Sequence, residues 1–250
     1  MTTYRGRRAF EISNGQLTVT VTQEGGHIAQ ILHQGTGVNP LWTPPWPSIE
    51  PSAYDPEKHS YGGDSEARLL AGIFGHNLCV DLFGGTTDDE AAAGMTVHGE
   101  SSVVPYDISV EGATLTQRAT FPQAQLGFER RLELRGDVLV IRETVENLSG
   151  WDRPSAWTQH VTLGPPFIER GVTRFRASAT RSKVFETDFA EGKGLQIVGA
   201  PFDWPLCPRK GGGHIDLRVF ESAPVSAGYT AHLMDPHRDQ AFFLGWHPRT

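Results

Sequence analysis

Two histidines stand in short, distinctive sequence frames, and imidazole is the side chain best suited to moving protons near neutral pH. His98 lies in GMTVHGE (residues 94–100), and His160 lies in AWTQHVTLGPP (residues 156–166). Both adjoin segments with the alternation of β-strands, and neither belongs to a metal motif, because HExxH, CxxC and HxH are absent. Two separated histidines at strand ends predict a shared pocket for a polar ligand.

The neighbours of His160 favour a ligand cavity. In a strand, Ala156, Thr158 and His160 share one face, while Trp157 and Gln159 point the other way. A histidine beside two small side chains has space around it. The alternative is a buried histidine bonded to a backbone carbonyl, which the sequence leaves open. For His98, a hydrogen-bonded structural role is the commoner outcome for such a residue.

Other polar and aromatic residues are candidates for binding. His76 and Asn77 follow a glycine-containing segment that lacks the spacing of a phosphate-binding loop, and Asn77 suits either a ligand hydroxyl or a turn cap. Trp42 lies in a proline-rich loop over residues 39–56. This loop is expected either to form a wall of the pocket or to pack over one end of the fold. Asp203 lies in a second loop, over residues 201–213.

The elements that must position these residues are strands. Alternating apolar residues, with turns rich in Gly, Pro, Asn and Asp, predict an all-β chain folded as a large antiparallel β-sandwich. Strands are expected at residues 16–22, 26–32, 103–110, 113–121, 127–134, 138–146, 155–163, 182–187, 216–221, 229–234 and 241–246, with one short helix at 65–70. Glu143 falls on the more apolar face of its strand, and we interpret it as a position at an exposed strand end.

Composition excludes several classes of protein. The chain has 250 residues, enough for a large core, and a net charge of −7 from 22 basic and 29 acidic residues. Without a basic block, neither nucleic acid nor an anionic membrane surface is an expected partner. No signal peptide and no membrane-spanning apolar run is visible, so a cytoplasmic protein is expected. Two cysteines in a chain of this length do not make a disulfide framework; a free buried thiol is the commoner outcome for Cys79, and the sequence leaves a pairing with Cys207 open.

The order of several motifs resembles the aldose 1-epimerase (galactose mutarotase-like) superfamily, in its poorly characterised bacterial epimerase-like branch. The matching segments span most of the chain: GGHI (residues 25–28), NPLW (39–42), GMTVHGE (94–100), FERRL to ENLS (128–149) and QHVTLG (159–164). The resemblance implies a supersandwich with a sugar-binding cleft, no cofactor, and interconversion of anomers by general acid–base catalysis. It implies that His160 protonates the ring oxygen and that His98 contacts the sugar.

Two departures from the family pattern affect the expected activity. The family has an Asn-Arg pair where this chain has His76-Asn77, and its catalytic glutamate lies near the C-terminus, whereas no glutamate follows Glu221 here. Either the single sandwich domain expected over residues 1–250 is truncated at its C-terminus, or Glu221 or another carboxylate substitutes, or mutarotation is not catalysed. The alternatives are a non-catalytic carbohydrate-binding protein and, more remotely, a metal-dependent sugar isomerase or lyase.

Overall fold

The computed structural model describes residues 1–62, 66–188, 191–221 and 228–250. The chain divides into two compact units, Met1–Pro165 and Pro166–Thr250, and each is described here by itself. The single domain expected over residues 1–250 stays a prediction. Strands dominate both units, which confirms the all-β fold class. No helix in the described part of the chain is long and apolar enough to cross a membrane.

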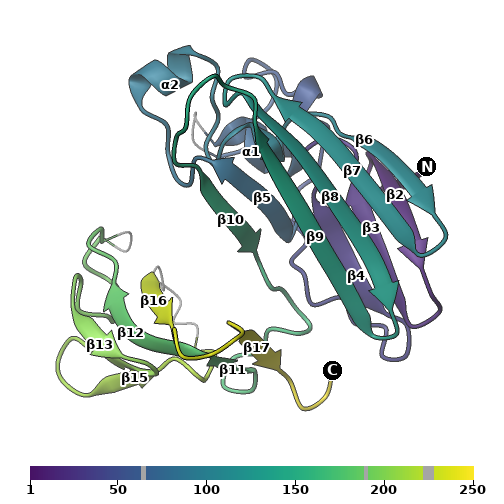
Figure 1. The fold of residues 1–250 in the computed structure, drawn as a ribbon. Coiled ribbons are helices and arrows are strands. Elements are labelled where there is room, and N and C mark those ends of the chain that lie inside the picture. Colours follow the sequence, from purple (N-terminus) through teal and green to yellow (C-terminus); the bar gives the residue numbers. More distant parts are fainter. Residues whose placement is uncertain (63–65, 189–190, 222–227) are drawn as a thin grey trace. The chain divides into compact units, whose positions relative to one another are not determined.

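The first unit consists of two antiparallel sheets (Figure 1). The six-stranded sheet contains, in order, β1 (Thr2–Tyr4), β2 (Arg7–Ser13), β3 (Leu17–Thr22), β4 (Ile28–His33), β5 (His76–Asp81) and β10 (Ala156–Val161). The four-stranded sheet contains β6 (Asp107–Glu111), β7 (Thr114–Phe121), β8 (Leu126–Arg135) and β9 (Val138–Asn147). The hairpin of β3 and β4 and the meander β6–β9 were both predicted from period-two alternation, and both are confirmed.

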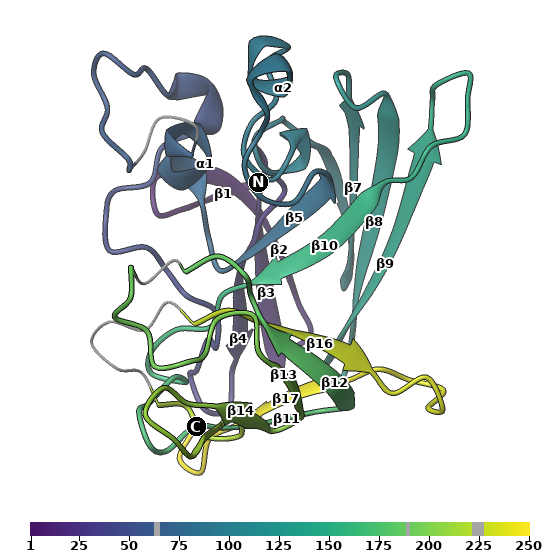
Figure 2. The ribbon, with the colours of Figure 1, turned by 90° about the vertical axis from the view of Figure 1, so that its left-hand side faces the viewer.

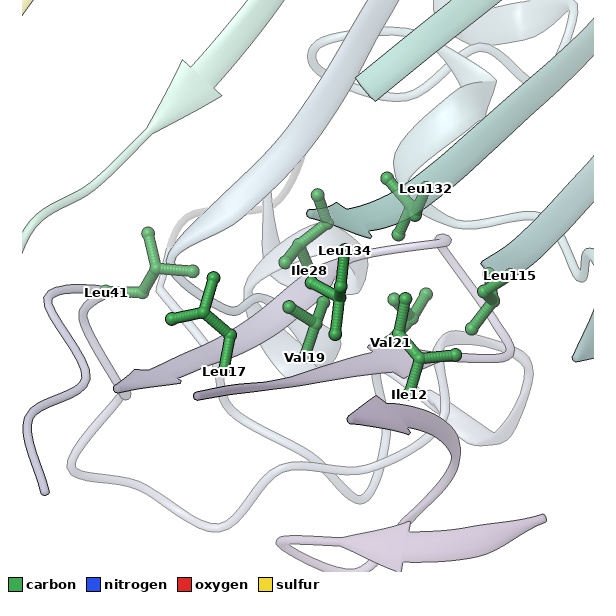
Figure 3. Close-up of a cluster of buried hydrophobic side chains, with 9 residues drawn as sticks. All are labelled: Ile12, Leu17, Val19, Val21, Ile28, Leu41, Leu115, Leu132 and Leu134. Atoms are coloured by element: carbon green, nitrogen blue, oxygen red, sulfur yellow. The ribbon is translucent and has the colours of Figure 1, made fainter. Parts of the chain in front are cut away.

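A hydrophobic core joins the two sheets (Figure 3). Val19 and Val21 of β3 contribute from one sheet, while Leu115 of β7 and Leu132 of β8 contribute from the other, and all four side chains are fully buried. Each such side chain adds about 1.5–3 kcal/mol of stabilisation on burial. This core fixes the sheets against each other, so the strands that carry the candidate residues have a rigid support.

Short helical segments cover one end of the sandwich. The helix expected at residues 65–70 is confirmed as α1 (Ala67–Gly72), although residue 65 lies outside the described residues. The 3₁₀ turns η1 (Pro51–Ala53) and η2 (Glu100–Ser102) were not predicted. Neither was α2 (Asp88–Ala92), although Thr87 and Glu90 form a capping box whose sequence signature was available.

The second unit contains small antiparallel sheets. β11 (Arg174–Ala177) pairs with β17 (Phe243–Trp246), β12 (Ala179–Val184) lies between β13 (Pro201–Asp203) and β16 (Thr230–Met234), and β14 (Leu206–Pro208) pairs with β15 (His214–Asp216). The strand expected at 216–221 is wrong beyond its first residue, because Asp216 and Arg218 form a local ion pair in a turn. Cys79 is free and buried, as expected, and Cys207 is free and buried as well.

Candidate functional site

The pairing of β5 with β10 sets the position of His160. The two strands lie side by side (Figures 1 and 2), and the antiparallel register places His160 opposite Asn77 and Thr158 opposite Cys79. Residues directly opposite in a ladder point to the same face. His160 therefore shares its face with Thr158 and Ala156, as the sequence predicted, and the Asn77 side chain lies beside it.

His98 is held on a strained turn next to this face. His98 has φ 66° and Gly99 has φ 81°, so two successive residues adopt left-handed conformations. The turn is anchored to Gly84 by two hydrogen bonds of 3.0 Å: the His98 amide donates to the Gly84 carbonyl, and the Gly84 amide donates to His98 Nδ1. A side chain outside a regular strand is thereby fixed in both position and rotation.

The structure brings the two histidines together. Their ring centroids are 5.3 Å apart with an interplanar angle of 33°. Phe83 completes an aromatic group, 5.0 Å from His98 and 6.2 Å from His160, and it is 51% exposed. An exposed aromatic ring next to two polar rings suits a ligand with apolar and hydroxylated faces. Phe83 was missed at the sequence level, where nothing distinguished it from the preceding apolar run.

Hydrogen bonds select opposite tautomers for the two imidazoles. Because Nδ1 of His98 accepts the Gly84 amide, its single proton in the neutral ring must be on Nε2. For His160, Nδ1 lies 3.0 Å from Asn77 Oδ1. The Asn77 orientation follows from Ser102, whose hydroxyl donates to the Leu78 carbonyl at 2.7 Å and therefore accepts from Asn77 Nδ2 at 3.1 Å. Thus His160 carries its proton on Nδ1, and its Nε2 is an acceptor.

Both imidazoles favour the neutral form. Partial burial lowers the pKa of His160 below its ordinary value, and burial together with the neighbouring His160 lowers the pKa of His98. Near neutral pH the pair therefore presents one Nε2–H donor, from His98, and one Nε2 acceptor, from His160. Neither Nε2 atom has a hydrogen-bond partner among the described residues.

His76 lies on the opposite face of β5, where it is buried and begins a chain of polar contacts that continues through the exposed Gln159. Gln159 donates to Glu143 Oε2 at 2.5 Å and accepts from His76 Nε2 at 2.7 Å. Glu143 also accepts from Trp157 at 2.9 Å and forms an ion pair of 2.6 Å with the buried Arg130. The Glu143 side chain is only 8% exposed, so its interpretation as an exposed strand end is wrong. An acidic residue on an apolar face here marks a buried ion pair.

Of the remaining predicted site residues, Asn77 lies behind His160, whereas Trp42 packs in a separate cluster and Asp203 lies on a strand of the second unit. Asn77 is fully buried, and its amide is occupied by His160 and Ser102. The Trp42 ring packs edge-on against Trp46 at 5.5 Å and joins the cluster around α1, although its backbone pairs with Thr162, just beyond His160. Asp203 belongs to the second unit, where it is exposed on β13. Its role in binding stays a prediction.

The carboxylates near the histidines in the first unit have other partners. Asp81 is on the His160 face but four residues beyond Asn77, roughly 13 Å along the strand. It forms an ion pair with Arg153. Glu100 is 6% exposed, accepts the Ala124 amide at 2.9 Å, and has its pKa raised by burial. Glu143 serves the opposite face. Each of these three carboxylates is therefore engaged by another protein group.

Gly99 offers a test of how firmly the His98 turn is held. A Cβ on Gly99 would lie 2.5 Å from the Val80 carbonyl oxygen, whereas a Cβ on Gly94, also at positive φ, would lie 3.9 Å from its nearest neighbour. Each Ala substitution should cost about 1–2 kcal/mol for the left-handed backbone. Only Gly99→Ala should lower the free energy of unfolding, measured in urea, by more than this amount. Only Gly99→Ala should also shift the His98 imidazole signals in NMR spectra. Equal losses with unshifted signals in both variants would contradict the close contact.

The fold and the paired histidines can now be compared with known proteins. No family model and no curated protein matches the sequence. Solved structures do match, and the fold is that of galactose mutarotase-like proteins. At identities of 11–14%, the likeness establishes the fold alone.

Three of these structures illustrate the match. A galactose mutarotase-like protein from Lactobacillus casei has a TM-score of 0.54 and 13% identity, over 84% of this chain and 67% of its own. A candidate aldose 1-epimerase from Escherichia coli K12 has a TM-score of 0.50 and 14% identity, over 78% of this chain and 61% of its own. A galactose mutarotase related enzyme from Lactobacillus acidophilus has a TM-score of 0.50 and 11% identity, over 95% of both chains. This chain thus spans about two thirds or less of the first two proteins' length.

Proposed function

We propose that this protein accelerates the interconversion of the α and β anomers of a free aldose, with His160 and His98 carrying the chemistry. The observation that supports the proposal is the half-buried pair of imidazoles, 5.3 Å apart and held in opposite tautomers. Opening a sugar ring requires removal of the anomeric proton and delivery of a proton to the ring oxygen, which is general acid–base chemistry. Such a reaction needs no cofactor.

The fold neighbours and Phe83 support a carbohydrate as the ligand. The names of the three matching structures refer to galactose mutarotases or to an aldose 1-epimerase. The exposed ring of Phe83 beside both histidines is a surface on which the apolar face of a pyranose can stack. A small carbohydrate is accordingly the proposed partner, and the cytoplasm stays the expected location.

A non-catalytic carbohydrate-binding protein on the same fold is the second candidate. It is favoured by the engagement of Asp81, Glu100 and Glu143 with other protein groups, because a carboxylate base is the usual companion of a histidine acid in this reaction. The metal-dependent isomerase would need three or more converging His, Cys, Asp or Glu side chains. The described part of the chain contains no such group.

Replacing His160 by alanine tests the proposed activity. The wild-type protein should accelerate the mutarotation of freshly dissolved α-D-galactose or α-D-glucose, measured by polarimetry or NMR exchange. His160→Ala should lower the protein-dependent rate by about 10²–10⁴-fold, the usual contribution of a general acid or base. His33→Gln, which alters an exposed histidine outside the site, is the control and should leave the rate unchanged.

Two results would contradict the proposal. Equal rates for wild type and His160→Ala would remove His160 from the reaction. Saturable binding of an aldose to the wild type, without any rate above the spontaneous one, would instead identify a binding protein.

A further inference from the structure

The fixed tautomers of the two histidines suggest how these two side chains alone could open a sugar ring. We infer that His160 is both base and acid, a single proton shuttle, and that His98 is the hydrogen-bond donor that stabilises the ring oxygen as it leaves. This inference rests on the proposed function and deepens it, because it assigns one role to each Nε2 atom.

The starting state follows from the hydrogen bonds. Asn77 Oδ1 holds the proton of His160 on Nδ1, which leaves the Nε2 lone pair free to accept. The Gly84 amide occupies Nδ1 of His98, which keeps its proton on Nε2. The lowered pKa of each ring keeps both neutral near pH 7. A neutral imidazole that donates from one nitrogen is suited to polarising a substrate oxygen rather than to giving up its proton.

The proton balance closes with these two groups alone. His160 Nε2 takes the proton of the anomeric hydroxyl, the C1–O1 bond becomes a carbonyl, and the C1–O5 bond breaks with its electron pair moving to O5. His98 Nε2–H donates to the developing charge on O5. The His160 imidazolium then returns the same proton to O5, giving the open-chain aldehyde and a neutral imidazole. Because O1 and O5 are bonded to the same carbon, one ring can serve both; rotation about C1–C2 and reversal of these steps produce the other anomer.

Asn77 is a positioning residue in this scheme. Its Oδ1 accepts from Nδ1 of His160 in both protonation states, so it selects the tautomer and stabilises the transient imidazolium. Its own orientation depends on the Ser102 hydroxyl and, through it, on the Leu78 carbonyl. A residue of this kind does not contact the substrate, which fits the complete burial of Asn77.

The pH profile separates this scheme from one with a distant carboxylate base. If His160 starts as the acceptor, kcat/KM for α-D-galactose or α-D-glucose should rise with pH through the pKa of His160 and then level off. If it starts as a protonated acid beside another base, kcat/KM should fall as pH rises through that pKa. The charged and titratable groups around His160 are His98 on the adjacent turn, His76 and Asp81 on β5, Arg153 with Asp81, and Glu143 with Arg130 through Gln159.

Variants of His98 and Asn77 test the two supporting roles. His98→Gln keeps an N–H donor and should retain the rate within about 10-fold, whereas His98→Phe keeps an aromatic ring without the donor and should lose about 10²–10³-fold, as for an oxyanion donor. Asn77→Asp places a negative charge at Nδ1 and should shift the acid limb of the profile to higher pH, which a merely structural change would not do.

NMR and the rate together decide the outcome. Imidazole ¹⁵N spectra of the wild type should show Nδ1–H for His160 and Nε2–H for His98. The reverse tautomers, or a kcat/KM that falls with rising pH, would overturn the shuttle while leaving the proposed activity intact. Equal losses in His98→Gln and His98→Phe would overturn the donor role. No acceleration by wild type at any pH would overturn the proposed function and the shuttle with it.

Discussion

Glu143→Ala should destabilise the first unit by about 3–5 kcal/mol, the range for breaking a buried ion pair from one side. The partner, Arg130, is fully buried and would keep its charge with no acid beside it. Its remaining hydrogen bonds are to the Gly26 carbonyl at 2.9 Å and to Gln117 at 3.3 Å, and neither partner carries a negative charge. Gln159 and Trp157 would also lose an acceptor. The free energy of unfolding is measured by urea denaturation, and hydrogen exchange of amides in β8 and β9 then shows whether the loss is local to these strands.

A matched control lies on the same sheet. Glu129 of β8 forms an ion pair of 2.6 Å with Arg118 of β7, but both side chains are exposed. Solvent-exposed pairs contribute 0–1 kcal/mol, so Glu129→Ala should change the free energy of unfolding by less than about 1 kcal/mol. If the two variants lose the same amount, burial is not what makes the Glu143 pair matter.

A double substitution keeps the prediction testable if Glu143→Ala does not fold. Arg130→Met combined with Glu143→Leu removes both charges together and replaces them with apolar side chains. Replacing a whole buried pair in this way is often neutral or stabilising. The double variant should therefore be more stable than Glu143→Ala, and a double variant that is less stable would contradict the cost assigned to the unpaired Arg130.

The strand pattern was predictable because its causes are local. Alternation in residues 113–121, 127–134 and 138–146 reflects one buried and one solvated face, and the structure has strands there within one residue at each end. β5 was missed as a strand because both of its faces are buried, including five of its six residues. The alternation of apolar and polar side chains that marks a half-exposed strand is therefore absent. In the second unit, the described turn after Asp216 replaced a strand because a local Arg–Asp pair competes with extension.

The site was predictable only in part. The sequence identified His98 and His160, since their frames were distinctive, and it brought Asn77 into consideration. It did not indicate that Asn77 is buried behind His160, nor that His76 faces the other way, because these facts depend on the pairing of β5 with β10. Ser102 and Gly84 carry no signal at all, because each acts through hydrogen bonds to partners more than ten residues away in the sequence.

Lowering the pH should destabilise the protein through two buried histidines, His27 and His76. Burial is the main cause that lowers each pKa to about 3, with further lowering by Arg7 for His27 and by Arg130 for His76. His27 is satisfied as a neutral ring: Nδ1 accepts the Phe74 amide at 3.0 Å, and Nε2 donates to the Ser102 carbonyl at 2.9 Å. Protonation would place a hydrogen on Nδ1, directly against the Phe74 N–H.

The sign of the effect follows from where each state binds protons. In the unfolded chain these histidines titrate near pH 6.5, whereas in the folded chain they stay neutral until about pH 3. Between these values the unfolded state holds more protons, so the free energy of unfolding decreases as pH falls. Each histidine contributes a slope of up to about 1.4 kcal/mol per pH unit below pH 6.5.

His27→Gln isolates one of the two contributions, and its readout is a slope rather than an absolute stability. Native-state hydrogen exchange of amides in β3 and β5, measured from pH 7.5 to 5, gives the slope of the free energy of unfolding against pH. This slope should be smaller in the variant than in the wild type by about 1.4 kcal/mol per pH unit, whatever the substitution costs at neutral pH. This window lies above the ordinary titration range of carboxylates, so histidines dominate it. An unaltered slope in His27→Gln would mean that His27 is not held neutral in the fold. The hydrogen bond from His27 to the Ser102 carbonyl, which helps to hold Ser102 next to Asn77, would then be weaker than its length of 2.9 Å indicates.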